Sequence, residues 1–193
     1  YFCKKCGIFT NLISDGHLNL RVPEGFTQQP LMTSPPNVTW LKEFLTPDEC
    51  NHIISISQNR FVPSNVVASD NSNARDENTR SSYSCHLQSA ETPIIKQIEQ
   101  RVADLTKYPV SHIEPLQIVR YSPGQQYIPH HDWFHDDNEK NQRSMTILAY
   151  LNDDFTGGST NFPKLDITTH PTQGDAVMWN NCAANDTKTC YDN

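Results

Sequence analysis

Apolar residues return at helical spacing in the first half of the chain. One such set lies on a single face of a predicted helix: Ile94, Ile95, Ile98, Val102 and Leu105. Thr92 and Pro93 precede this set and suit the N-cap and the first helical position. An earlier helix is predicted to begin at the capping box Thr46-Pro47-Asp48-Glu49 and to run to about Gln58. Two helices are therefore expected before residue 110.

From Leu116 onward, short apolar and β-branched runs alternate with turn sequences. The predicted strands are LQIVRYS, the segment around 127 to 132, RSMTILAYLN, STNFP, DITTH and DAVMWN. Helices followed by short strands predict a mainly β domain with N-terminal helices, built as an antiparallel double sheet or jelly roll.

Polar and Pro-rich stretches divide the chain. QQPLMTSPPN ends a segment, residues 1–36, that is predicted to be a lead-in or linker, and residues 37–193 are predicted to form one domain. DNSNARDEN predicts an exposed, mobile loop over residues 70–79 that could close as a lid.

Charge and hydropathy exclude two classes of partner. The chain has 15 Lys and Arg against 22 Asp and Glu, a net charge of -7, and its basic residues are scattered. Nucleic acid is therefore not expected as a partner. The longest mainly apolar run, MTILAYL, is far shorter than the roughly 18 residues of a membrane-spanning helix, so no membrane segment is expected.

Cysteines and glycosylation patterns favour a secretory compartment. Cys3 and Cys6 could be half of a zinc site, a disulfide or a free pair, and Cys182 and Cys190 could close a small loop. Two tripeptides match the N-glycosylation pattern: Asn37-Val-Thr and Asn185-Asp-Thr. The chain begins with Tyr and shows no signal-peptide pattern, so we expect a piece of a longer product located in the endoplasmic reticulum lumen.

The stretch YIPHHDWFHDD, residues 127–137, carries the most concentrated candidate metal chemistry. On an extended segment, side chains two residues apart share a face, so His130 and Asp132 would point the same way and His131 the other way. One imidazole and one carboxylate at this spacing, with a third ligand from a distant strand, are typical of the facial triad of non-haem Fe(II) oxygenases. His130 and Asp132 are therefore the candidate metal ligands.

Further motifs surround this pair in a fixed order. They are LQIVRY at 116–121, PGQQYIPHHD at 123–132, Arg143-x-x-Thr146 before AYLN, GGSTNFP at 157–163 and GDAVMWN at 174–180. This set resembles the prolyl 4-hydroxylase family of 2-oxoglutarate- and Fe(II)-dependent dioxygenases. The resemblance runs from about Leu41 to the end, because LTPDEC and Arg80-Ser81-Ser82 are also similar to the family.

The resemblance implies roles for individual residues. It makes His130 and Asp132 catalytic iron ligands, and it places Tyr121 and Thr160 in the pocket for 2-oxoglutarate. It places Tyr127 and Arg143 against the substrate, which is implied to be a proline-containing peptide or protein. The implied fold is the double-stranded β-helix, and the implied cofactors are Fe(II), 2-oxoglutarate and ascorbate.

The family pattern also requires a second histidine after the WNN segment and then a Lys or Arg. Neither has a match here, since His170 and Lys188 stand too early. We therefore expect a chain truncated before the second iron-ligand histidine, and inactive in this form. The alternatives are a dioxygenase that acts on a small molecule or another protein side chain, and a non-catalytic binding module of the same fold.

Overall fold

A computed structural model describes residues 5–13, 25–67, 73–134, 142–183 and 186–191. In chain order its elements are β1 (Lys5–Ile13), β2 (Thr27–Met32), β3 (Val38–Lys42), α1 (Pro47–Ser57), β4 (Val62–Pro63), β5 (Val66–Val67), β6 (Asn73–Ala74), β7 (Tyr83–His86), α2 (Pro93–Thr106), a 3-10 turn (Val110–His112), β8 (Gln117–Tyr121), β9 (Arg143–Tyr150), β10 (Thr160–Phe162), β11 (Ile167–Thr169), β12 (Ala176–Asn180), β13 (Cys182–Ala183) and β14 (Asp186–Cys190). Most of these elements are strands, as the sequence predicts.

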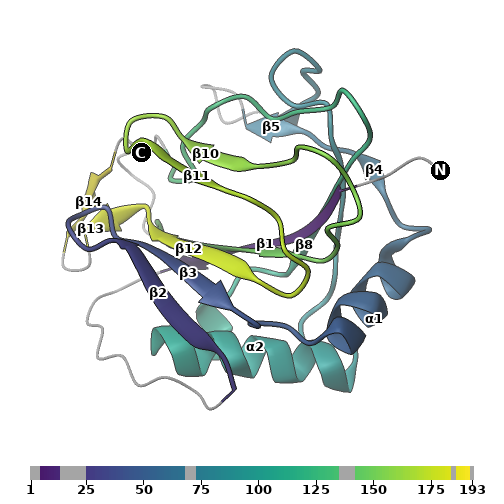
Figure 1. Ribbon diagram of the computed structural model, residues 1–193, viewed down its shortest axis with the longest axis horizontal. Helices are drawn as coiled ribbons and strands as arrows, with labels where there is room; N and C mark the ends of the chain where they lie inside the picture. Colours follow the sequence, from purple (N-terminus) through teal and green to yellow (C-terminus); the bar gives the residue numbers. More distant parts are fainter. Residues whose placement is uncertain (1–4, 14–24, 68–72, 135–141, 184–185, 192–193) are drawn as a thin grey trace.

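The main sheet has eight strands in the order β2-β3-β12-β9-β1-β8-β7-β4, and all its neighbouring pairs are antiparallel. Three two-stranded sheets accompany it: β10-β11, β13-β14 and β5-β6. Figure 1 shows α1 and α2 on one side of the main sheet and the β10-β11 hairpin on the other.

Both helices begin as the sequence predicts. The Thr46 hydroxyl accepts a hydrogen bond from the Glu49 N–H, and the Glu49 carboxylate accepts one from the Thr46 N–H, which completes the capping box. At the start of α2, the Thr92 hydroxyl accepts a bond from the Ile95 N–H. Helix α2 ends at Lys107, which adopts a left-handed conformation with φ of 65°.

Apolar side chains cover both faces of the main sheet. On the helix face, Ile95, Ile98 and Leu105 of α2 are buried with Ile118 of β8 and Ile147 of β9. On the other face the buried cluster consists of Val38, Tyr150, Phe162, Val177 and Trp179. Trp179 is thus a core residue.

The N-terminal segment differs from the predicted lead-in. Strand β1 lies inside the main sheet between β8 and β9, with Ile8 opposite Ile118 on one side and Ala149 on the other. Strand β2 pairs with β3 at the sheet edge. Both partners of β1 lie more than a hundred positions away in sequence, so no local pattern of turns and alternation could reveal the pairing.

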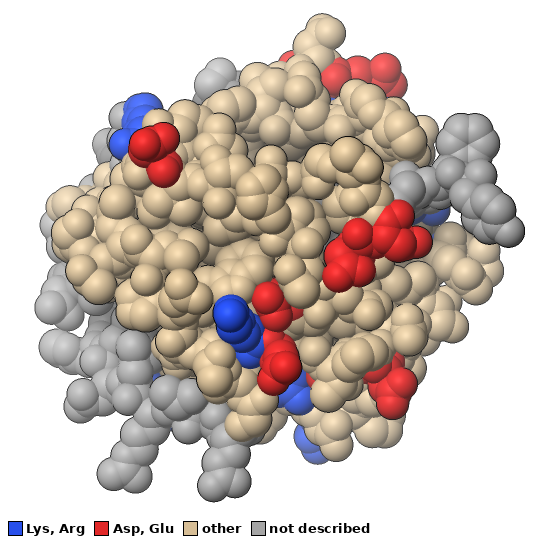
Figure 2. Space-filling model, viewed as in Figure 1, with Lys and Arg blue, Asp and Glu red and all other residues tan. Residues whose placement is uncertain are grey.

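Neither helix in the described part of the chain is long and apolar enough to cross a membrane. On the face shown in Figure 2, acidic and basic side chains lie in small separate groups. Of the predicted 70–79 loop, residues 70–72 lie outside the described residues, and β6 pairs with β5.

Candidate active site

The segment that carries His130 and Asp132 is a loop, and the prediction of a strand over 127–132 is wrong. Tyr127 forms an isolated antiparallel bridge with Arg80, and the Ile128 N–H bonds the Thr79 carbonyl. Pro129, which has no N–H to donate, follows at once, and the pairing stops there. The shared face expected from strand alternation therefore cannot explain how the two candidate ligands meet.

The loop nevertheless brings His130 and Asp132 together. His130 Nε2 lies 3.2 Å from Asp132 Oδ1, and Asp132 is buried. His130 Nδ1 lies 2.8 Å from the Ile128 carbonyl oxygen, which can only accept, so Nδ1 carries the proton. In the neutral ring Nε2 then presents a lone pair toward the carboxylate.

This donor set fits a metal ion. A lone pair and a carboxylate oxygen 3.2 Å apart repel unless a proton or a cation lies between them. An imidazole nitrogen with its other nitrogen bonded to a carbonyl is the usual state of a histidine ligand. His130 and Asp132 can therefore hold a divalent cation through one nitrogen and one oxygen.

A chain of hydrogen bonds orients the Asp132 carboxylate. The Thr146 hydroxyl donates to Asp132 Oδ2 at 2.8 Å, and the Asn181 side-chain amide donates to the Thr146 oxygen at 2.9 Å. Thr146 and Asn181 are almost fully buried. These bonds occupy Oδ2 and leave Oδ1 directed at His130.

Gln142 and Arg143 fix the residues that follow Asp132. The Gln142 side chain accepts from the Phe134 N–H at 2.7 Å and donates to the Phe134 carbonyl at 2.9 Å. Arg143 Nε and Nη2 lie 2.8 and 2.9 Å from the two oxygens of Glu114, and its guanidinium lies 4.6 Å from the centre of the Phe134 ring. Arg143, which the resemblance places against substrate, is thus bound to a carboxylate within this chain.

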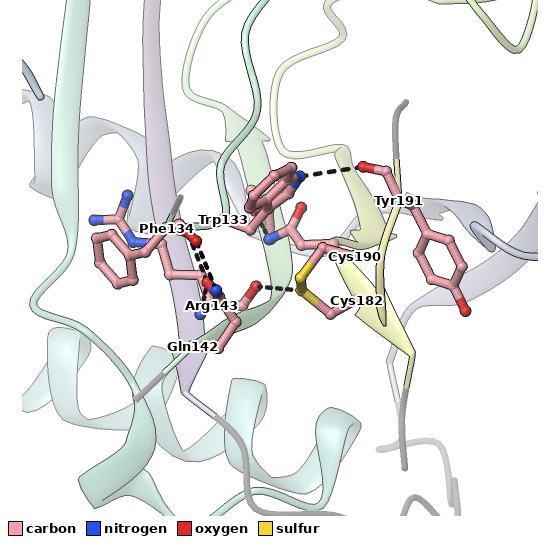
Figure 3. The surroundings of a disulfide bond; sticks show 9 residues. Trp133, Phe134, Gln142, Arg143, Cys182, Cys190 and Tyr191 are labelled. Atoms are coloured by element: carbon pink, nitrogen blue, oxygen red, sulfur yellow. Dashed lines mark hydrogen bonds between the residues drawn. A yellow bond between two sulfur atoms is a disulfide. The ribbon is translucent and has the colours of Figure 1, made fainter. Parts of the chain in front are cut away.

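A disulfide closes the other side of this loop. Cys182 and Cys190 are bonded, as the sequence allowed, and they join β13 to β14. The Trp133 indole N–H donates to the Tyr191 carbonyl at 3.2 Å, so the disulfide hairpin contacts the residue after Asp132 (Figure 3). Cys3 and the Asn185 sequon lie outside the described residues.

Tyr127 and Tyr121 stand beside the pair. The Tyr127 ring stacks on the His130 ring with 3.5 Å between centroids. Burial raises the pKa of Tyr127 and of Tyr121, and the Tyr121 hydroxyl is hydrogen bonded to Ser82. Both tyrosines predicted to contact ligands are therefore part of one neighbourhood with His130 and Asp132.

Thr160 lies in different surroundings. The Tyr150 hydroxyl donates to the Thr160 hydroxyl at 2.8 Å and also lies 2.9 Å from that of Thr169, and both threonines belong to the β10-β11 hairpin. The Thr160 hydroxyl is thus bonded to Tyr150 of the buried cluster on the face opposite the helices. Its predicted role in the 2-oxoglutarate pocket stays a prediction.

Within the described residues, no group of three or more His, Cys, Asp and Glu side chains gathers as a metal site. His135, the third histidine of the stretch 127–137, lies outside them. The described part of the site thus contains two candidate ligands, His130 and Asp132.

Sequence reasoning missed the residues that position these ligands. Thr146 was noted only within a motif, and Gln142, Asn181 and Ser82 were not assigned a role. A signal existed for Thr146, since it is a hydroxyl in the otherwise apolar run MTILAYL, and a buried hydroxyl needs a partner. Nothing local marks the other three.

The chain is similar in sequence to known proteins. Residues 116–187 match the sequence profile of the 2OG-Fe(II) oxygenase superfamily. Probable prolyl 4-hydroxylase 3 of Arabidopsis thaliana is 43% identical over 123 residues, which cover 62% of this chain and 43% of that protein. Prolyl 4-hydroxylase 1 of the same plant is 35% identical over 162 residues, covering 75% of this chain and 57% of that protein.

A solved structure shows the same fold. The viral collagen prolyl hydroxylase vCPH from Paramecium bursaria Chlorella virus-1, solved as a 2OG complex, has a TM-score of 0.62 and 24% identity, and the match covers 80% of this chain and 82% of that one. The expected fold class, mainly β and of the double-stranded β-helix type, is confirmed.

The match to the 2OG-Fe(II) oxygenase superfamily covers residues 116–187, and the curated relatives that the chain resembles are plant prolyl 4-hydroxylases. The chain spans about half the length of the curated relatives it matches.

Proposed function

We propose that the chain is part of a 2-oxoglutarate- and Fe(II)-dependent dioxygenase that hydroxylates peptidyl proline. The observation that carries this proposal is the His130–Asp132 pair, with Nε2 and Oδ1 3.2 Å apart and the carboxylate held by Thr146. The match of residues 116–187 to the 2OG-Fe(II) oxygenase superfamily and the similarity to plant prolyl 4-hydroxylases support it.

Each residue of the site has a physical task in this reaction. His130 and Asp132 would hold Fe(II), which with 2-oxoglutarate and O₂ would supply the oxidising chemistry: one oxygen atom of O₂ would convert a C–H bond to C–OH, and the other would enter succinate as 2-oxoglutarate loses CO₂. Thr146 keeps the carboxylate oriented, and the Ile128 carbonyl keeps the imidazole in the tautomer that binds metal. Tyr127 stacks on His130 and limits its rotation.

The substrate proposed is a proline-containing peptide or protein in extended form. Tyr127 presents a half-buried ring at the site, which suits contact with a pyrrolidine ring or an extended backbone. Arg143 would contact substrate only after leaving Glu114, so in the present arrangement it braces the loop.

Ascorbate and the compartment are parts of the same proposal. Ascorbate is proposed as a reductant because the resemblance implies it. The Cys182–Cys190 disulfide and the exposed Asn37 sequon support an oxidising, glycosylating compartment such as the endoplasmic reticulum lumen.

The test compares two aspartates in the native gene product. Succinate and hydroxyproline are measured after incubation with Fe(II), 2-oxoglutarate, ascorbate and poly-L-proline. Asp132→Ala should abolish both products, and Asp104→Ala, at an exposed position of α2, should change neither.

The outcomes separate the alternatives. Full activity in Asp132→Ala contradicts the proposed site. Succinate without hydroxyproline contradicts a peptidyl-proline substrate and favours another substrate. No Fe(II) binding and no succinate from the wild type would favour a binding module of the same fold.

A further inference from the structure

A cavity of about 300 Å³ lies against the apolar cluster on the helix face of the main sheet. Ile118 belongs to that cluster, and Ile54 and Phe61 pack on it. These three apolar side chains line the cavity together with polar ones, among them Gln58, Arg120 and Asp154. We call it the Arg120 cavity.

The Arg120 cavity lies on the opposite face of the main sheet from the candidate active site. Ile118 and Arg120 are two residues apart in β8 and share the helix face, whereas Tyr121 projects from the other face. Tyr121 stands near Asp132, whose charge acts on its pKa after the larger effect of burial. A molecule in the Arg120 cavity would therefore leave the His130–Asp132 pair accessible.

The side chain of Arg120 points to a ligand in this cavity. Its Nε is buried and has no hydrogen-bond partner. Its guanidinium lies 4.4 Å from the centre of the Phe61 ring and 5.6 Å from that of Tyr83. Ring faces attract the positive charge, but they do not replace the oxygen acceptors that the five N–H groups of a guanidinium can use.

Among the arginines that the structure describes, Arg120 alone has neither an ion pair nor a side-chain hydrogen bond. Arg80 also lacks a carboxylate partner, but it donates to three oxygens. The others each form an ion pair: Arg60, Arg75, Arg101 and Arg143. Buried donors without an acceptor are uncommon in folded proteins, so the Arg120 guanidinium suits an acceptor from outside the chain.

We propose that the Arg120 cavity binds a small monocarboxylate with an apolar body. The guanidinium fork matches a carboxylate in shape and charge, and Ile54 and Phe61 supply the apolar contacts typical of small-molecule sites. Asp154 adds a negative charge to the lining, which disfavours a second carboxylate on the ligand. The proposal does not depend on the dioxygenase reaction.

Calorimetric titration of the native gene product with three probes tests the ligand class. Benzoate has one carboxylate, benzamide replaces it by a neutral amide of similar shape, and terephthalate adds a second carboxylate to the same ring. Benzoate should bind most tightly, and benzamide roughly ten- to a hundredfold more weakly, the range for loss of a charged hydrogen bond. Equal affinity for benzoate and benzamide, tighter binding of terephthalate, or no binding of benzoate overturns the proposal.

Variants of two neighbouring arginines test the position of the ligand. Arg120→Gln should weaken benzoate to the level of benzamide, and Arg120→Lys should retain part of the difference. Arg60 is the matched control, because it precedes Phe61 but already donates to Glu91 at 2.5 Å and to the His86 carbonyl at 2.9 Å. Arg60→Gln should leave benzoate binding unchanged, and an equal loss in Arg60→Gln and Arg120→Gln contradicts the proposal.

Two further variants keep the test decisive. Ile54→Trp retains Arg120 but fills the cavity, so it should abolish benzoate binding even if Arg120→Gln does not fold. Asp132→Ala should bind benzoate as the wild type does, and a loss there would place benzoate in the candidate active site and overturn the proposal. Loss of benzoate binding in Arg120→Gln supports the cavity site even if the native protein forms neither succinate nor hydroxyproline.

Discussion

Two regions of the molecule, the helix face of the main sheet and the loop of residues 127–134, are held in place by different forces. The helix face buries large apolar side chains, among them Ile98 and Ile118, that are almost completely inaccessible. The loop has one bridge to Arg80, and Asp132 and Phe134 are otherwise held by polar contacts from Thr146 and Gln142. Apolar burial provides stability, whereas a few directed hydrogen bonds provide the geometry of the site.

The largest expected effect is on the free energy of unfolding, and it should differ strongly between Ile98 in the core and Ile128 in the loop. Ile98→Ala should lower the free energy of unfolding by about 3 to 4 kcal/mol, because Ile98 is only 1% exposed and its removal leaves a cavity in the helix-face core. Ile128→Ala, at a side chain 38% exposed, should lower it by less than about 1 kcal/mol. Urea denaturation measures both.

Equal losses of unfolding free energy in Ile98→Ala and Ile128→Ala would contradict the view that apolar burial stabilises the helix face more than the loop. The Ile128 carbonyl, which bonds His130, is unchanged in its variant, so Mn(II) binding followed by EPR should also be unchanged. A large loss of Mn(II) affinity in Ile128→Ala would show that side-chain packing positions the imidazole.

A smaller effect is expected at the ion pair that joins α1 to α2. Glu49 accepts from Arg101 at 2.7 and 2.9 Å; burial opposes its ionisation, but these bonds and those from Thr46 lower the pKa of Glu49 below its ordinary value. Glu49→Gln should cost about 2 kcal/mol at neutral pH, since Arg101 loses its carboxylate partner and keeps its bond to the Phe44 carbonyl.

The pH dependence follows from the direction of that pKa shift. A lowered folded-state pKa gives stability that is present above the unfolded value of about 4.5 and is lost as pH falls through the folded value. The difference between wild type and Glu49→Gln should therefore shrink below about pH 4. Glu77→Gln, at an exposed ion pair with Arg75, is the control and should change stability little at any pH. If the difference in unfolding free energy between wild type and Glu49→Gln stays constant down to pH 2, the charge of the Glu49 carboxylate is not its source.

The same contrast explains what the sequence could predict. Helices α1 and α2 were predicted with their caps because capping and apolar spacing are local properties. His130 and Asp132 were chosen by a strand argument that the loop does not follow, yet their pairing holds because Thr146 and Ile128 orient them.

Contacts between segments far apart in the sequence could not be predicted from local sequence patterns. Strand β1 pairs with β8 and β9, and Arg80 forms an isolated bridge with Tyr127. The residues next to each of these segments do not indicate which partner it has. Gln142 bonds the backbone of Phe134, a contact set by the loop conformation and by no motif.

The sharpest division between the regions is expected from two buried threonines. Thr146 donates to Asp132 Oδ2 in the site, and Thr106 donates to the Val102 carbonyl in α2. Replacing either by Val removes one buried hydroxyl at nearly constant volume and should cost about 1 to 2 kcal/mol of unfolding free energy. The Thr146 change also leaves the Asn181 amide without its acceptor and frees the Asp132 carboxylate to rotate away from His130. Mn(II) affinity should fall roughly ten- to a hundredfold in Thr146→Val, the range for loss of a group that orients a ligand, and should stay unchanged in Thr106→Val. EPR titration of Mn(II) alongside urea denaturation measures both quantities on the same samples. If Mn(II) affinity falls equally in the two variants, general loosening of the fold accounts for it, and the hydrogen bond from Thr146 has no separate role in positioning Asp132.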